Sequence, residues 1–242
     1  MSNSSADKAT SFAHRIALLK QGEHLCSVYA EFGEMLTQVV PYIKAGLLNG
    51  ERCIYVADEN NKEDLVHALT FWGVDAELAM NRGQLAFWTR HDYRQPGTFD
   101  LNRMLDFVRG TLDKAVADGH HGIRLAVEMS WTINNGISDA DLVRWEGFIN
   151  TISFAGSNVS FLCQYNSRLL SASLIAKAVH VHPVVLLGQD ICPNRFYCSA
   201  TDVLTAPNHD NLDSLLIKIN PPDSLQSNLK THACLERASE PA

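Results

Sequence analysis

Apolar residues along this chain follow two alternating periods. Short runs rich in β-branched and aromatic residues alternate with longer segments whose apolar residues recur at helical spacing. Between residues 31 and 48, for example, Phe32, Met35, Val39 and Ile43 fall on one face of a helix. The pattern therefore predicts strands and amphipathic helices in strict alternation.

Six strands and five following helices are predicted in this way. The strands are His24–Tyr29, Arg52–Ala57, Leu85–Trp88, Ile123–Glu128, Val159–Tyr165 and Pro183–Gly188. The helices are Glu31–Leu48, Asn61–Trp72, Asp100–Asp118, Asp139–Phe154 and Ser171–Val179. Repeated strand–helix units indicate a mainly parallel sheet, and nearly continuous apolar strands indicate that helices cover both faces. The predicted fold is a three-layer α/β/α sandwich.

The length of 242 residues fits one large domain with short extensions. Residues 1–22 are expected to form a polar lead-in with some helical character, and residues 23–204 the domain itself. Residues 205–242 form an extension in which residues 212–219 suit either a strand or a helix. From about residue 223 the chain is polar, and disorder is expected there.

Charge and cysteine content exclude several classes of protein. A net charge of −7 argues against direct nucleic-acid binding, which depends on basic surfaces. We expect neither a membrane span nor a signal peptide, so the predicted location is the cytoplasm. The six cysteines form no CxxC pair, and Cys26, Cys53 and Cys163 lie in apolar runs. These three are expected to be buried, reduced thiols.

The first strand–helix turn lacks the residues of a phosphate-binding loop. Such a loop needs GxxxxGK[ST], whose amides and lysine hold phosphates. Here one glycine stands between Glu31 and Glu34, and no lysine is present. A GxGxxG fingerprint is also missing. The chain is therefore predicted to have no functional Walker A motif and to hydrolyse no nucleotide.

Nucleophilic and metal motifs are weak. GxSxG is absent, and Cys163, which could pair with His24 or His182, lies within a strand rather than on a strained turn. His180 and His182 alternate onto one face, but no third ligand follows at a defined spacing. We therefore expect no catalytic residue, no metal and no cofactor other than an unidentified small-molecule ligand. An enzyme that uses Cys163 with His182, or Glu128, remains an alternative.

Six segments follow one another in a recognisable order: HLCSVYAEFGEML, VVPYIKAGLLNGERCIYVADEN, GTFDLNRMLDFV, GIRLAVEMSW, FLCQYNSRLLS and HPVVLLG. Together they resemble one known family, the MEDS domain, a sensory domain of methanogens and methylotrophs first described in a regulator of dichloromethane degradation. The resemblance implies a RecA/KaiC-like fold without a working phosphate loop. It also implies sensing of small molecules, with simple hydrocarbon derivatives as the proposed class, rather than catalysis.

Members of this family are typically fused to histidine kinase, DNA-binding or other signalling modules. Because about 45 residues follow the matched region here, we expect a stand-alone sensor that acts on a signalling protein, such as a histidine kinase or another regulator, or that self-associates. The alternative to a ligand sensor is a ligand-free regulator that only binds proteins.

Candidate site residues follow from the strand ends. Ligands of open parallel sheets bind beyond the carboxyl ends of the strands. The residues expected to line a pocket there are Tyr29, Glu128, Trp131, Gln164 and Tyr165. Four further residues in matching motifs belong either to the pocket or to the core: His24, Cys26, Cys163 and His182. For Glu128 a bond to neighbouring backbone, or to an arginine, is an equal alternative to ligand contact, and Trp131 could simply be packed in the core.

Overall fold

A computed structural model describes residues 12–89, 92, 100–133, 137–153, 158–206 and 211–221. Its strands are β1 (His24–Tyr29), β2 (Arg52–Ala57), β3 (Leu85–Thr89), β4 (Ile123–Glu128), β5 (Val159–Asn166), β6 (Val184–Leu187) and β7 (Asp190–Pro193). Its α-helices are α2 (Phe32–Leu48), α3 (Lys62–Phe71), α4 (Ala76–Asn81), α6 (Leu101–Ala117), α7 (Asp139–Ser153), α8 (Ala172–His180), α9 (Ala200–Thr205) and α10 (Leu212–Ile219). A 3₁₀ turn, η1 (Met129–Thr132), follows β4.

The strands form one seven-stranded sheet in the order β3-β2-β4-β5-β1-β6-β7. All neighbours are parallel except β7, which runs antiparallel to β6. The six predicted strands are confirmed. Strand β7 was not predicted, because its four residues alternate too briefly to show a period and Gly188, at a φ of 56°, turns the chain back directly after β6.

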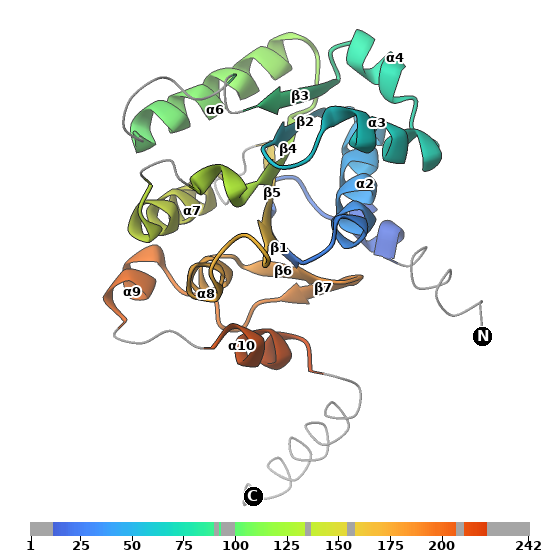
Figure 1. Cartoon of the computed structure of the whole chain (residues 1–242). Coiled ribbons are helices and arrows are strands. Elements are labelled where there is room, and N and C mark those ends of the chain that lie inside the picture. Colours follow the sequence, from blue (N-terminus) through green and yellow to red (C-terminus); the bar gives the residue numbers. More distant parts are fainter. Residues whose placement is uncertain are drawn as a thin grey trace, which may run out of the picture.

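Helices cover both faces of the sheet, as predicted (Figure 1). One apolar core lies between the sheet and α2, α3 and α4. The other lies between the sheet and α6, α7 and α8, with α10 at its margin. The short helices α4 and α9 were not predicted, since six residues carry less than two helical turns of pattern. Residues 212–219 form a helix.

The lead-in contributes to the core. Residues 12–17 are helical, and Phe12 and Ile16 are fully buried in the core that contains α2. At the other end, the disorder expected from about residue 223 lies outside the described residues. The boundaries at residues 22 and 204 remain predictions.

Local signals explain where the helices begin and end. Asp100 accepts hydrogen bonds from the amides of Asn102 and Arg103, as expected for the N-cap of α6. Ser138 Oγ accepts from the Asp141 amide and so caps α7. After α2 the chain reverses at Gly50, whose φ of 73° suits glycine.

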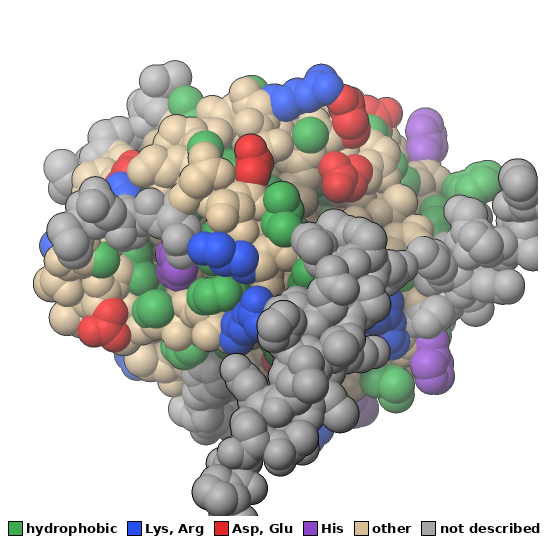
Figure 2. Space-filling model, turned by 90° about the horizontal axis from the view of Figure 1, so that it is seen from below, with side chains coloured by type: hydrophobic (Ala, Val, Ile, Leu, Met, Phe, Trp, Pro, Cys, Tyr) green, Lys and Arg blue, Asp and Glu red, His purple; other side chains and the backbone are tan. Residues whose placement is uncertain are grey.

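Figure 2 shows one face of the molecule, with acidic and basic side chains interspersed on it. Where this face is not covered by grey atoms, no extended patch carries charge of a single sign. Within the described residues, no helix is both long and apolar enough to cross a membrane.

Candidate functional site

The turn between β1 and α2, where a phosphate loop would lie, consists only of Ala30 and Glu31. The Ala30 amide donates to Glu34 Oε2 at 3.0 Å, and Arg168 forms an ion pair with Glu31. In a phosphate-binding loop, backbone amides such as this one point at the ligand. Here the amide is already hydrogen-bonded to a carboxylate of the chain.

Glu128 closes the turn that follows β2. Its carboxylate accepts from the amides of Asp58, Glu59 and Asn60 at 2.8, 2.6 and 3.1 Å, from Asn60 Nδ2 at 2.9 Å, and from the Tyr55 hydroxyl. Burial raises the pKa of Glu128, although these donors oppose the shift. Both oxygens are occupied, so the geometry favours the alternative in which this carboxylate binds neighbouring backbone.

Two more candidates lie on the same side of the sheet as Glu128. The Tyr29 hydroxyl donates to Glu59 Oε1 at 2.6 Å, and Tyr29 is packed in the α2 core. Gln164 pairs with Glu128 across β5 and β4, and its buried amide nitrogen and oxygen have no hydrogen-bond partner within the described part of the chain. These three residues therefore share one side of the carboxyl edge.

On the opposite face, a cavity of about 40 Å³ lies between the sheet, α6 and α7. Three of the four tryptophans of the chain line it, and Trp131 is one of them. Its lining residues are Val56, Trp88, Met104, Phe107, Val108, Leu125, Val127, Met129, Trp131, Trp145, Ile149, Phe161 and Cys163. The lining is apolar and aromatic apart from the Cys163 thiol.

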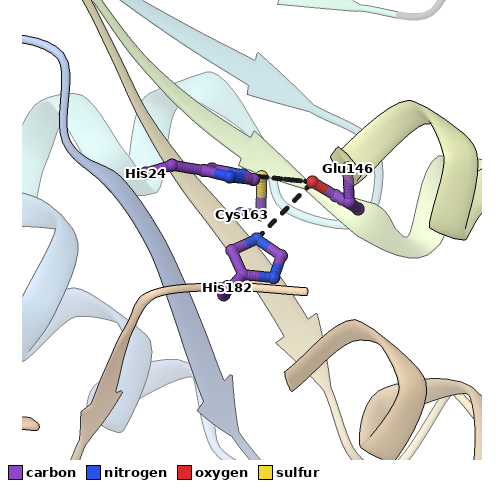
Figure 3. A group of neighbouring side chains, drawn as sticks. All are labelled: His24, Glu146, Cys163 and His182. Carbon is purple, nitrogen blue, oxygen red and sulfur yellow. Dashed lines mark hydrogen bonds and ion pairs between the residues drawn. The ribbon is translucent and has the colours of Figure 1, made fainter. Parts of the chain in front are cut away.

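Beside this cavity, four side chains from four separate elements point toward one another (Figure 3). His24 lies on β1, Glu146 on α7, Cys163 on β5, and His182 precedes β6. All four are buried, and one ligand atom from each lies within 4.8 Å of the others. Glu146 Oε2 lies 3.1 Å from His24 Nε2, 3.5 Å from His182 Nε2 and 3.5 Å from Cys163 Sγ. We call this group the His–Glu–Cys cluster.

Neighbouring residues orient the cluster. Tyr165 Oη donates to Glu146 Oε1 at 2.6 Å, which leaves Oε2 facing the cluster. His24 Nδ1 lies 2.9 Å from Asn150 Oδ1, and His182 Nδ1 lies 2.7 Å from the Ala178 carbonyl. The Nε2 atoms of both histidines therefore face inward.

Burial sets the protonation of these groups. Burial and the neighbouring His24 lower the pKa of His182 to about 3, so its imidazole is neutral near pH 7. Burial and the charge of Glu146 raise the pKa of Cys163. Burial alone would raise the pKa of Glu146, but His182, His24 and the Tyr165 hydroxyl lower it on balance. The chain thus places a carboxylate against a neutral imidazole and a protonated thiol.

The structure divides the sequence-derived candidates into three groups. His24, Cys163, Tyr165 and His182 meet around Glu146, and Cys26 pairs with Cys163 on the neighbouring strand. Trp131 lines the cavity. Tyr29, Glu128 and Gln164 lie on the other side of the sheet, so the nine candidates do not form a single pocket.

Sequence reasoning missed Glu146 and Asn150. Both are buried polar residues on the inward face of α7, among Leu142, Ile149 and other apolar residues. The signal available in the sequence was that these two polar residues lie four positions apart, on the helix face that is otherwise apolar. His180, by contrast, does not join the cluster, since its Nδ1 lies 3.0 Å from the Phe196 carbonyl.

The sensory-domain model described as "MEthanogen/methylotroph, DcmR Sensory domain" matches residues 23–183. This chain belongs to the MEDS family. The transcriptional repressor DcmR of Methylorubrum extorquens (strain DSM 6343 / CIP 106787 / DM4) is 27% identical over 161 residues. The match covers 66% of this MEDS chain and 58% of the repressor, which is less than two thirds of the repressor's length. A sensory or regulatory role is therefore supported for the MEDS region.

Two solved structures resemble the MEDS chain in fold. The flagellar accessory protein FlaH of Methanocaldococcus jannaschii has a TM-score of 0.50 at 14% identity, with 75% of this chain and 80% of FlaH covered. A KaiC-like protein of Pyrococcus horikoshii OT3 has a TM-score of 0.46 at 14% identity, with coverages of 69% and 71%. The predicted mainly parallel α/β fold of the RecA/KaiC-like type is confirmed by the strand order and the FlaH likeness.

Proposed function

We propose that this MEDS module is a sensor that binds a small apolar molecule in the cavity between the sheet, α6 and α7. The observation that carries the proposal is the lining of that cavity, which combines three tryptophans with aliphatic side chains. Binding there would be passed to a signalling protein, such as a histidine kinase or another regulator, or to a second copy of the chain. The family and its repressor relative support the regulatory part of this proposal.

The size and polarity of the cavity define the class of ligand. One water-sized molecule needs about 10–15 Å³, so a cavity of about 40 Å³ accepts a molecule of a few heavy atoms. An apolar lining gives a charged ligand no partner and makes its desolvation costly. Small neutral compounds such as dichloromethane fit this description, and small carboxylates do not.

The geometry gives less support to catalysis. The Cys163 thiol is fully buried, and its raised pKa opposes the thiolate that a nucleophile needs. Both Glu128 oxygens already accept hydrogen bonds from the chain. The two enzyme alternatives, which use these residues, are therefore less well supported than ligand sensing.

Tryptophan fluorescence and thermal unfolding test the cavity directly. Dichloromethane should raise the Tm of the wild-type chain in proportion to its occupancy and should change the fluorescence of the lining tryptophans. Formate, a charged one-carbon compound, should do neither. Native mass spectrometry of freshly purified protein would show whether a small molecule is retained; a retained mass supports the sensor over a ligand-free interaction regulator.

A matched pair of substitutions on α6 supplies the control. Val108→Phe fills the cavity, because Val108 is one of its lining residues, and should abolish the dichloromethane response. Val116→Phe makes the same change on the same helix at a side chain that is 52% exposed and should keep the response. A wild-type chain without any response, or equal responses of the two variants, would contradict the proposal.

A further inference from the structure

We propose that His24, Glu146, Cys163 and His182 bind one divalent metal ion, for which zinc is the best match. His24 lies 122 positions from Glu146 and 139 positions from Cys163 along the sequence, so only the fold brings these residues together. They come from β1, α7, β5 and the turn before β6, so the ion would tie the central sheet to α7.

The distances between the donor atoms fit a tetrahedral site. Zinc bonds of about 2.0–2.3 Å place the ligand atoms of a tetrahedron roughly 3.3–3.8 Å apart. In the cluster, His24 Nε2 lies 3.4 Å from Cys163 Sγ and 3.1 Å from Glu146 Oε2, while His182 Nε2 lies 3.5 Å from Glu146 Oε2. Every pair of the four ligand atoms is within 4.8 Å. Small shifts of side chains would complete the tetrahedron.

The hydrogen bonds around the histidines determine which ring nitrogen faces the cluster. Asn150 Nδ2 donates to the Val181 carbonyl at 2.7 Å, so Asn150 Oδ1 is an acceptor and His24 Nδ1 must carry the proton. His182 Nδ1 likewise carries a proton, because it faces the Ala178 carbonyl. Both Nε2 atoms are then free to coordinate, which is the arrangement found around metal-binding histidines.

One atom of the cluster has no hydrogen-bond partner among the residues that the structure describes. His182 Nε2 is completely buried, forms no hydrogen bond and faces Glu146 Oε2. With the proton on Nδ1, a lone pair would oppose a carboxylate oxygen, and buried polar groups are seldom left in that state. A cation between the two atoms would convert this repulsion into two bonds.

The donor set selects the metal. Two imidazoles, a thiolate and a carboxylate oxygen suit zinc, whereas calcium and magnesium require oxygen ligands. Coordination would release the Cys163 proton to solvent, since thiols bind metals as thiolates. Four protein ligands leave no open position, so the site would be structural rather than catalytic.

Metal analysis of the full-length chain tests this site. After expression in zinc-supplemented medium and removal of any affinity tag, mass-spectrometric elemental analysis should find about one zinc per chain. X-ray absorption should show one sulfur and three nitrogen or oxygen neighbours. Cobalt(II) substitution should give the visible absorption of a tetrahedral ion and a thiolate charge-transfer band. A metal-free chain that also fails to bind added zinc or cobalt, or a bound ion without sulfur, would overturn the proposal.

Substitutions distinguish a cysteine that coordinates the metal from one that is only buried. Cys163→Ser should lose the charge-transfer band, while Cys53→Ser, a buried strand cysteine on the other side of the sheet, should keep it. Asn150→Ala should weaken zinc binding by about 10–100-fold with the cobalt spectrum otherwise retained, because Asn150 only positions His24. Should Cys163→Ser fail to fold, the absorption data on the wild-type chain decide the question. A band that persists in Cys163→Ser overturns the assignment.

Discussion

Individual carboxylates in this protein have opposite roles on the two sides of one sheet. Glu128 accepts hydrogen bonds from the turn after β2 with both oxygens, whereas Glu146 accepts one from Tyr165 and directs its other oxygen at two imidazoles and a thiol. Neither role follows from residue type or burial, since both side chains are fully buried. The partners that surround each carboxylate determine what it does.

Glu128→Ala should reduce the free energy of unfolding by about 3–5 kcal/mol, because it leaves several buried donors without an acceptor. Urea unfolding followed by circular dichroism measures the change. Asp113→Ala, at an exposed position on α6, is the control and should stay within about 0.5 kcal/mol of the wild type. A Glu128→Ala variant as stable as this control would show that the carboxylate is not needed for the turn.

At the scale of elements, close packing of α2 on the sheet depends on one glycine. Gly46 faces a buried ion pair in which Arg124 Nε donates to Glu51 Oε2 at 2.5 Å. The Arg124 guanidinium also lies 4.8 Å from the centre of the Tyr42 ring. Without a side chain at position 46, α2 approaches this pair and Cys53 directly.

Gly46→Ala should therefore destabilise the protein by about 1–3 kcal/mol, since its Cβ would lie 2.6 Å from Cys53 Sγ and 2.8 Å from Arg124 Cδ. Gly110→Ala tests the opposite case within α6, where an added Cβ meets no atom within 4 Å. There alanine should stabilise the helix by about 0.5–1 kcal/mol. Thermal unfolding of both variants gives the signs, and equal effects would contradict the packing explanation.

The whole molecule combines a mainly parallel α/β fold with a turn after β1 that carries carboxylates. The turn between β1 and α2 has two residues, and Glu31 and Glu34 bring negative charge to it. A phosphate bound to the amides of this turn would lie beside these carboxylates, which would repel it. The candidate chemistry lies instead on the α6–α7 side, where Cys163 belongs both to the apolar cavity and to the His–Glu–Cys cluster.

Nucleotide binding is accordingly expected to be absent. A ligand at 100 times its Kd stabilises a folded protein by about 2.7 kcal/mol, which thermal unfolding detects easily. Millimolar Mg-ATP or Mg-GTP should leave the Tm unchanged, while the same assay on a protein with an intact phosphate loop should show a rise. A magnesium-dependent rise for this chain would refute the prediction and reopen hydrolysis as a function.

Sequence periodicity determined the order of elements and the layers, because alternation of strand and helix patterns is a local property of the chain. Residues 24–29 and 159–165, for example, are already recognisable as buried strands from their continuous apolar runs. The short elements β7, α4 and α9 were missed for the same reason, since they contain too few residues to show a period.

The site was decided by tertiary structure. His24, Cys163 and His182 were candidates from sequence, but their meeting at Glu146 depends on strand order and on the rotation of α7. The prediction of a single pocket at the carboxyl edge used only the positions at which the strands end. Those positions do not say on which face of the sheet each side chain lies. Contacts between residues more than 100 positions apart, such as His24 and Glu146, are set by packing of whole elements, which no local pattern encodes.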